Sequence, residues 1–172
     1  MLADFPETRL RDLVQAVADL SFDAITITRS TPAQGPEIIF VNDAFTHLTG
    51  YPASEVIGQT PGVLQGEETD SAVLERLNAT VQRGETFHGT AVNYRKDGTP
   101  FWNDLYIAPI RDDEGQITHF VGVQNDISER KSVESQLAYN TSHDVLTGLP
   151  NRVLLEDRLI QASQIAHREK RY

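Results

Sequence analysis

The spacing of hydrophobic positions along the chain predicts both helices and strands. Hydrophobic side chains at three- and four-residue steps indicate amphipathic helices over residues 6–20 and 70–83. Alternating or β-branched stretches indicate five strands, at residues 24–28, 37–41, 87–95, 100–110 and 117–125. Further helices are expected at residues 42–48, 52–56, 126–140 and 151–167.

The order of these elements predicts an α+β fold. Its centre is a five-stranded antiparallel sheet with helices on one face, flanked by N- and C-terminal helices. Two loops that contain glycine, at residues 96–98 and 112–115, join the last three strands as hairpins. The segment 58–66 has four glycine or proline residues and is expected to be a loop.

Three amide side chains fall on one face of the predicted sheet. A three-residue loop with Gly98 in the left-handed conformation places Asn93 and Asn103 on the same face, whereas a two-residue loop would separate them. Gln124 lies on that face of the last strand. Burying three amides in an apolar pocket is unfavourable unless a polar partner binds there, so we expect a flat polar ligand.

Small residues share this face, at Gly89, Ala91 and Gly122. They leave room for a planar guest. They are equally consistent with β-bulges or with a close approach of a helix to the sheet. The glycines alone favour neither interpretation.

Composition narrows the classes of function. The chain has 172 residues and a net charge of -10, which argues against nucleic-acid binding because no basic stripe is present. It has no apolar run long enough to span a membrane and no signal peptide, so a cytoplasmic protein without membrane contact is expected. The absence of cysteine removes thiol nucleophiles and thiolate metal sites, and the five histidines are scattered without metal-ligand spacing.

A series of short motifs now identifies a family. In chain order they are residues 41–45 (VNDAF), 48–51 (LTGY), 64–70 (LQGEETD), 93–98 (NYRKDG), 101–103 (FWN), 109–112 (PIRD) and 122–124 (GVQ). Together they resemble a PAS domain of the LOV type over about residues 22–128. The order and number of these motifs make the resemblance specific.

The resemblance implies a flavin cofactor and a set of residues that contact it. These residues are Gln65, Asn93, Asn103 and Gln124, with Thr28, Thr60 and Asn78 completing the expected cofactor-binding set. An amide can complement either the acceptors or the N–H of the flavin ring edge. Gln124 is expected to face N5 and to rotate when flavin reduction turns N5 from an acceptor into a donor.

The chain also departs from the family at positions that matter. Pro61 stands where the family has its photoreactive cysteine, so a flavin–thiol adduct cannot form. Gly62 and Asn78 stand where the family has phosphate-binding arginines, which should weaken phosphate recognition by about a few kcal/mol. Arg76 or Arg83 are possible substitutes. FMN, FAD and riboflavin therefore all remain candidate cofactors.

The C-terminal segment resembles a second family. Residues 143–152 (HDVLTGLPNR) and 154–159 (LLEDRL) are similar to the opening of a GGDEF diguanylate cyclase domain. The resemblance implies an organisation of N-terminal helix 1–21, sensor domain 22–128, linker helix 129–142 and truncated GGDEF start 143–172. It also implies a cyclic-di-GMP signalling parent protein, with a phosphodiesterase domain as a further option. This fragment itself should have no enzyme activity.

These observations lead to one main hypothesis and one alternative. The main hypothesis is a homodimeric flavin sensor of light or redox state that signals through the linker helix, with the 6–20 and linker stripes as dimer surfaces. The 6–20 stripe is equally consistent with packing on the sheet of its own chain. Trp102, Tyr94 or Tyr106 could donate electrons to the flavin, or could be ordinary sheet residues. The alternative is a cofactor-free PAS dimerisation module. Nothing in the sequence supports an enzyme, because neither a nucleophile elbow nor paired pocket carboxylates are found.

Overall fold

The computed structural model describes residues 15–31 and 35–142, together with residues 144, 147, 149–151 and 155. The chain divides into two units, Met1–Ser128 and Glu129–Tyr172, which are described separately. The strands are β1 (Ala24–Thr31), β2 (Gly35–Val41), β3 (Phe87–Tyr94), β4 (Pro100–Arg111) and β5 (Ile117–Asp126). The helices are α2 (Asp43–Thr49), α3 (Ala53–Val56), the 3-10 helix η1 (Pro61–Leu64), α4 (Ser71–Gln82) and α5 (Ser128–Ser142).

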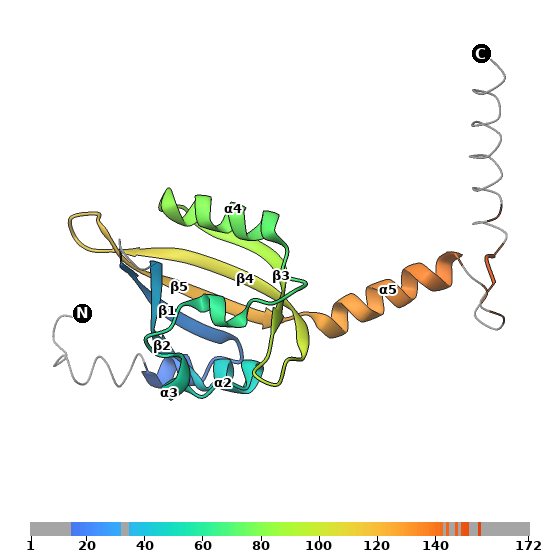
Figure 1. Ribbon diagram of the computed structural model, residues 1–172, viewed down its shortest axis with the longest axis horizontal. Coiled ribbons are helices and arrows are strands. Elements are labelled where there is room, and N and C mark those ends of the chain that lie inside the picture. The colour runs from blue at the N-terminus through green and yellow to red at the C-terminus, as the bar shows by residue number, and fades with distance from the viewer. Residues whose placement is uncertain are drawn as a thin grey trace, which may run out of the picture. The chain divides into compact units, whose positions relative to one another are not determined.

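The five strands form one antiparallel sheet in the order β2-β1-β5-β4-β3. Helix α4 packs along β3, while α2 and α3 lie against β1 and β2 (Figure 1). The register places Leu105 of β4 opposite Gly89 of β3 on one side and Gln124 of β5 on the other. The predicted α+β fold with a five-stranded antiparallel sheet is confirmed.

The hairpin between β3 and β4 fixes the face on which the amides lie. The Arg95 N–H donates to the Thr99 carbonyl at 2.9 Å, which closes a loop of three residues, and Gly98 has φ +85°. Such a positive φ is costly for any residue with a Cβ. As predicted, this loop puts Asn93 and Asn103 on the same face of the sheet.

Asn42 holds the beginning of α2 to the N-terminal part of the unit. Its Oδ1 accepts from the Phe45 N–H at 3.0 Å, which caps α2, and from the Ile25 N–H at 2.8 Å. Its Nδ2 donates to the Ala18 carbonyl at 2.8 Å. Since Asn42 is almost fully buried, these bonds are what makes its burial tolerable.

The hydrophobic core lies under β1 and β2. It is formed by buried side chains from the two strands and the short helices, namely Ala24, Ile38, Val41, Phe45, Val56 and Leu64. Ile38 is tied to the loop after α3, because its N–H donates to the Gln59 carbonyl at 2.8 Å and its carbonyl accepts from Gly58. This core occupies one end of the inner face and leaves the other end to the site described below.

Several element boundaries differ from those predicted. Strand β1 extends beyond its predicted end to Thr31, and within this extension Arg29 forms an ion pair with Glu37 of β2. The 3-10 helix η1 occupies part of the segment that was predicted to be a loop. Helix α3 begins after Pro52 without a side-chain cap. The predicted helix 151–167, the GGDEF-like segment and residues 6–14 lie largely or wholly outside the described residues.

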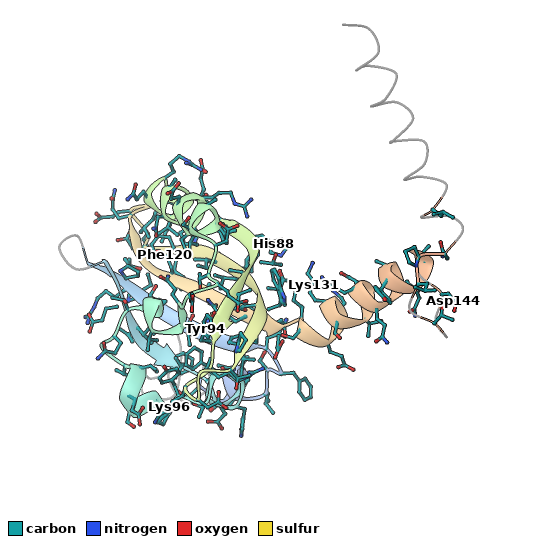
Figure 2. The ribbon with its side chains drawn as sticks, turned by 45° about the vertical axis from the view of Figure 1, so that its right-hand side comes forward. His88, Tyr94, Lys96, Phe120, Lys131 and Asp144 are labelled. Carbon is teal, nitrogen blue, oxygen red and sulfur yellow. The ribbon has the colours of Figure 1, made fainter. Side chains whose placement is uncertain are left out.

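Tyr94 packs directly on Gly66. A Cβ at position 66 would collide with the ring of Tyr94, which is labelled in Figure 2. The Tyr94 hydroxyl accepts a hydrogen bond from the Glu68 N–H at 2.9 Å. Thr69 adds a second link from this loop to β3, because its hydroxyl donates to the Val92 carbonyl at 2.7 Å. The loop before α4 is therefore anchored on β3.

Helix α5 is polar and exposed over its described length. Its large hydrophobic side chains Val133 and Leu137 are exposed, and Arg130 pairs with Glu134 one turn later. Among the helices of the described residues, none combines the length and the apolar character that a membrane crossing requires.

Candidate functional site

A cavity of about 710 Å³ lies between the inner face of the sheet and the segment formed by η1 and α4. We call it the inner cavity. All seven residues of the predicted cofactor-binding set line it: Thr28, Thr60, Gln65, Asn78, Asn93, Asn103 and Gln124. The structure therefore brings together residues that are up to 96 positions apart in the chain.

The three strand amides form one hydrogen-bonded row. Asn103 Nδ2 donates to Asn93 Oδ1 at 2.8 Å and to Gln124 Oε1 at 3.1 Å. Asn93 Nδ2 donates to the Val92 carbonyl at 3.2 Å. Gln124 Nε2 lies 3.5 Å from Thr26 Oγ1, at the limit of a hydrogen bond. The row thus runs across three neighbouring strands and ends at β1.

One atom in this row has no partner. Asn103 is completely buried, and its Oδ1 makes no hydrogen bond with any described residue. A buried acceptor without a donor costs about 1–3 kcal/mol. A ligand that offers an N–H or O–H at this point would remove that cost, so the cavity has the chemistry of a site for a polar ligand.

The remaining predicted residues line other walls of the inner cavity. Thr60 precedes η1, Gln65 follows it, Asn78 comes from α4 and Thr28 from β1. The sequence prediction missed Thr26 and Gln82, which also line the cavity. Thr26 was detectable in principle, because it lies two residues before Thr28 and shares its face.

The small residues of the inner face, Gly89, Ala91 and Gly122, all line the inner cavity. A Cβ on Gly122 would lie 2.6 Å from Thr26 Oγ1, and one on Gly89 would lie 2.7 Å from Arg76 Nη2. Both positions serve close approach of neighbouring side chains. The strand registers run without a shift through both glycines, so the β-bulge interpretation is wrong here.

Neither candidate phosphate-binding arginine lines the inner cavity. Arg76 stacks its guanidinium over the Phe87 ring at 5.4 Å. Arg83 pairs with Glu85 at 2.8 Å and donates to Thr80 Oγ1 at 3.4 Å. Pro61 and Gly62 do line the cavity, at the start of η1.

The three aromatic residues considered as electron donors all lie outside the cavity lining. Trp102 and Tyr106 alternate with the inward-facing residues of β4 and are partly exposed on the opposite face. Tyr94 is engaged by Gly66 and Glu68 as described above. Their positions are those of sheet residues, outside the lining of the inner cavity.

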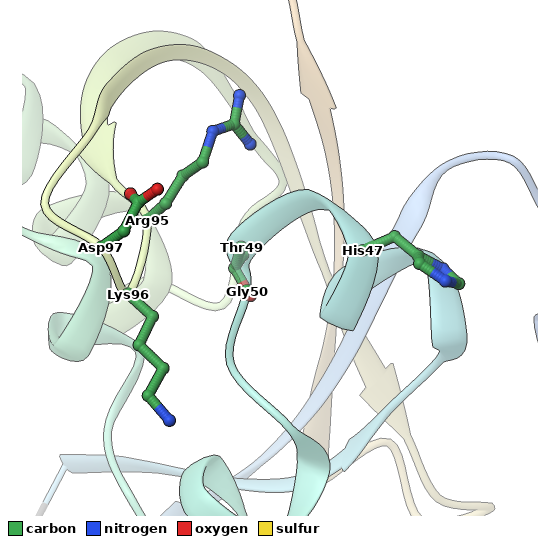
Figure 3. Close-up of a pocket in the computed structure, with 6 residues that line it drawn as sticks. All are labelled: His47, Thr49, Gly50, Arg95, Lys96 and Asp97. Carbon is green, nitrogen blue, oxygen red and sulfur yellow. The ribbon is translucent and has the colours of Figure 1, made fainter.

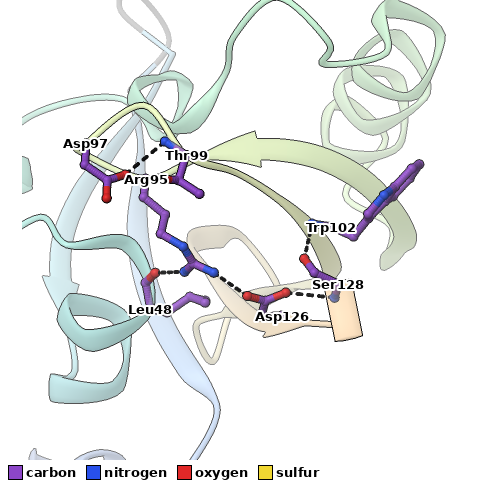
Figure 4. Close-up of polar contacts among 7 residues, drawn as sticks. All are labelled: Leu48, Arg95, Asp97, Thr99, Trp102, Asp126 and Ser128. Atoms are coloured by element: carbon purple, nitrogen blue, oxygen red, sulfur yellow. Dashed lines mark hydrogen bonds and ion pairs between the residues drawn. The ribbon is translucent and has the colours of Figure 1, made fainter. Parts of the chain in front are cut away.

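A charged cluster joins the β3–β4 hairpin to the end of β5. Arg95 stacks on the Phe101 ring at 4.6 Å and donates to the Leu48 carbonyl and to Asp126 (Figure 4). Asp126 in turn accepts from the Ser128 N–H at 2.8 Å, and the Ser128 hydroxyl oxygen accepts from the Trp102 N–H at 2.8 Å. Asp126 lies opposite Asn103 in the β4–β5 register, so the cluster borders the amide row.

This cluster shifts the ionisation of Asp126. Burial raises the pKa of its carboxyl, but hydrogen bonds from the Ser128 hydroxyl and N–H and the nearby Arg95 together hold the pKa below its ordinary value. The pKa of Asp97 also lies below its ordinary value, because the backbone N–H and hydroxyl of Thr99 bond to the carboxylate. Both carboxylates are therefore negative at neutral pH.

A second hollow lies on the surface between the end of α2 and the β3–β4 hairpin (Figure 3). Its polar side chains do not converge: His47 points away from the hairpin residues. Lys96 pairs with Glu55 at 2.7 Å, and Arg95 is held by Asp126. We therefore assign the site to the inner cavity. No group of three or more metal-ligating side chains occurs in the described part of the chain.

Comparison with known proteins agrees with this geometry. The family model for the PAS domain matches residues 23–129. A solved light-oxygen-voltage domain, the subject of work with a flavin analogue, is 32% identical with a TM-score of 0.63, and the match covers 82% of this chain and 98% of that chain. The chain belongs to the PAS domain family, in its LOV group.

Two curated relatives are much longer than the segment that this chain matches. Phototropin-2 of Oryza sativa subsp. japonica is 44% identical over 92 residues, which are 54% of this chain and 10% of that protein. Blue-light-activated histidine kinase 2 of Erythrobacter litoralis (strain HTCC2594) is 35% identical over 135 residues, 78% of this chain and 34% of that protein. The chain thus spans about a tenth and about a third of the lengths of these two relatives. The LOV domain is a sensory, non-catalytic domain.

Proposed function

We propose that this LOV domain is a flavin-binding sensory input module, and that Gln124 reads the state of the flavin. The observation that carries the proposal is the inner cavity, which nine polar side chains line, among them the buried Asn103 whose Oδ1 has no partner. The names of two relatives add support, since they describe a blue-light-activated histidine kinase and a blue-light photoreceptor.

The residues of the inner cavity suit an isoalloxazine ring. The unpartnered Asn103 Oδ1 would accept from the ring N–H, and Asn93 and Gln65 would bind the carbonyl edge. A bound flavin supplies redox chemistry at N5, which accepts a hydrogen bond when oxidised and donates one when reduced. Gln124 could follow that change by rotating its side-chain amide, because the amide oxygen accepts a hydrogen bond and the amide nitrogen donates one.

Rotation of the Gln124 amide would change its hydrogen bond with Asn103 in the amide row. Gln124 Oε1 accepts from Asn103, whose strand neighbour in the register is Asp126. Asp126 holds the first residue of α5 through the Ser128 N–H. A hydrogen-bond change at Gln124 therefore has a short covalent and hydrogen-bonded route to the start of the linker helix.

An absorption spectrum of the purified chain, with mass spectrometry of any released ligand, tests flavin binding. Flavin bands, or uptake of added FMN, FAD or riboflavin, are the expected result. A colourless protein that takes up none of the three would favour the alternative, a cofactor-free PAS dimerisation module. In that case the mutual bonds of Asn93, Asn103 and Gln124 would serve only the packing of the sheet.

Light and redox inputs can be separated in the same sample. Without a cysteine the domain cannot form a thiol adduct, so either light or a reductant must change the redox state of the flavin. Reversible bleaching of the oxidised bands by blue light at fixed oxygen would identify a light sensor. Bleaching by chemical reductant alone would identify a redox sensor.

The parent protein is proposed to be a homodimeric cyclic-di-GMP signalling protein. Support comes from residues 143–152 and 154–159, which resemble the start of a GGDEF domain, and from the exposed apolar side chains Val17 and Leu20 near the N-terminus. Diguanylate cyclase activity of the longer protein, changed by illumination or reduction, is the expected result. A longer protein without GTP-dependent product would remove this part of the proposal.

A further inference from the structure

The inner cavity is polar but carries no charge. None of the described residues that line it has an ionisable side chain. Its polar groups are all neutral amides and hydroxyls: Thr26, Thr28, Thr60, Gln65, Asn78, Gln82, Asn93, Asn103 and Gln124. A ligand that lies inside therefore meets hydrogen-bonding groups and apolar walls, but no counter-ion.

The arginines on and beside α4 do not line the inner cavity, and they already have partners. Arg76 lies over the Phe87 ring, with its Nη2 2.7 Å from the position that a Cβ on Gly89 would take. Arg83 is paired with Glu85, and Arg111 donates to the carbonyls of Gly84 and Gly115, both at 2.9 Å.

A phosphate monoester would be poorly accommodated under these conditions. It carries a charge of about -1.5 to -2 at neutral pH, and its usual affinity comes from charge-assisted bonds to arginine or lysine. Removing such a group from water without a counter-ion is unfavourable. The net charge of -10 on the chain adds a repulsive long-range field.

The far end of the cavity is suited instead to hydroxyl groups. Asn78 and Gln82 lie one turn apart on α4, so their amides line the same side of the helix. The end of α4 lies beside the β4–β5 hairpin, because Arg111 bonds to the Gly84 carbonyl. Thr28 pairs with Phe120 of β5, which lies four residues along that strand from Gln124 of the amide row, about 13 Å at the rise of a strand. The neutral polar lining thus continues along the cavity beyond the amide row.

We infer that the inner cavity recognises a neutral flavin, the ring with its polyhydroxyl chain, and that a terminal phosphate contributes no affinity. The inference rests on the proposed flavin-binding function and specifies its ligand. Riboflavin meets every recognition group that the cavity offers. FMN and FAD would bind through the same part, with their phosphates directed to solvent.

Titration of flavin-free protein with riboflavin and with FMN, followed by quenching of flavin fluorescence at low and high salt, tests the inference. The dissociation constants are expected to agree within about threefold, with riboflavin the tighter at low salt because the FMN phosphate is repelled. FMN binding at least tenfold tighter than riboflavin would overturn the inference and leave flavin binding intact. Failure of both ligands to bind would overturn the proposed function as well.

Two variants test the cause of this selectivity. Asn78→Arg places a cation in the lining and should favour FMN over riboflavin by at least tenfold at low salt, whereas Ala79→Arg adds the same charge to an exposed position on α4 and should not. Arg76→Gln should leave the FMN-to-riboflavin ratio unchanged. A selective loss of FMN affinity in Arg76→Gln would show that Arg76 leaves Phe87 to bind the phosphate, and the inference would be wrong.

Discussion

Asn103 is the residue on which the amide row depends. Its Nδ2 donates hydrogen bonds to both Asn93 and Gln124, and its Oδ1 is the buried acceptor without a partner. Asn93 and Gln124 each take part in only one of those bonds. Losing Asn103 therefore removes more of the site than losing either neighbour.

Asn103→Ala should weaken flavin binding and the fold together. The variant leaves Asn93 Oδ1 and Gln124 Oε1 without their donor in a buried setting, at a cost of about 1–3 kcal/mol. We expect a tenfold or greater rise in the flavin dissociation constant and a lower free energy of unfolding. Asp104→Asn, which alters the adjacent side chain paired with His88, is the matched control. Equal flavin affinity in Asn103→Ala and the parent would contradict the assigned role.

Gln124→Leu should separate binding from response. Leucine fills a similar volume but can neither accept nor donate, so we expect less than a tenfold loss of flavin affinity, about 1 kcal/mol. The change in hydrogen-exchange protection at the end of β5, measured between oxidised and reduced protein, should be strongly reduced. A variant that responds like the parent would show that the signal does not pass through Gln124.

At the scale of elements, neighbouring strands on the inner face of the sheet pack closely at Gly122. Gly122 of β5 and Thr26 of β1 are opposite each other in the register, and a Cβ at position 122 would lie 2.6 Å from Thr26 Oγ1. Real Cβ contacts are longer, so one side chain must move if both are present. The glycine therefore sets how closely the two residues approach at the cavity floor.

Gly122→Ala should destabilise the domain by about 1–3 kcal/mol because it overpacks this contact. Thr26→Ala removes the colliding oxygen, so the double variant should be more stable than the sum of the two single changes predicts. Urea unfolding of the four proteins measures this coupling. Strictly additive effects would show that the backbone relaxes and that the contact is unimportant.

The charged cluster at the end of β5 makes part of the stability depend on pH. The pKa of Asp126 is lower in the folded chain than the value of about 3.9 in an unfolded one. The resulting stabilisation is present above the unfolded pKa and is lost as the pH falls through the folded pKa. Since the Asp126 side chain is 28% exposed and solvent screens the cluster, we expect about 0.5–1 kcal/mol at neutral pH.

Asp126→Asn should therefore lower the free energy of unfolding at pH 7 by that amount and leave it almost unchanged near pH 3. Denaturant unfolding at the two pH values measures the difference. Asp113→Asn, in the exposed β4–β5 loop, removes the same charge outside the cluster and is the control. A constant deficit at both pH values would indicate lost packing and not lost ionisation.

The sequence predicted the sheet, and the shared face of the strand amides, well where period and turn chemistry agree. Gly98 fixed the loop length, so the shared face of Asn93 and Asn103 followed from alternation alone. It predicted less where tertiary contacts decide. The 3-10 helix η1 formed within a glycine- and proline-rich segment, and β1 continued past Thr28 because β2 pairs with its polar end. The position of Arg76 on Phe87 could not be read from helix periodicity, since it depends on the path of β3.

At the scale of the whole molecule, exposed apolar side chains occur in the sequence both before β1 and after β5. Val17, Leu20 and Phe22 are more than half exposed within six residues. Val133 and Leu137 are exposed on α5. Large apolar residues grouped on a surface often mark protein contacts. Both groups therefore remain candidates for the proposed homodimer interface.

Substitution of Val17 and Leu20 by glutamate should weaken the dimer by at least tenfold, about 1.4 kcal/mol, if the N-terminal group is the interface. The matched pair Val133→Glu and Leu137→Glu tests the linker in the same way. Sedimentation equilibrium over a range of concentrations measures both. If neither pair changes the average mass, the proposed surfaces are wrong.

The contact of Tyr94 with Gly66 constrains how this domain can vary. The aromatic ring fills the volume that any side chain at position 66 would need, so the two sites cannot change independently. Homologues with a bulkier amino acid at the first site should carry a smaller one at the second. Such a pair of substitutions would remove the hydrogen bond from the Glu68 N–H to the Tyr94 hydroxyl. Other contacts would then have to hold the loop that precedes α4.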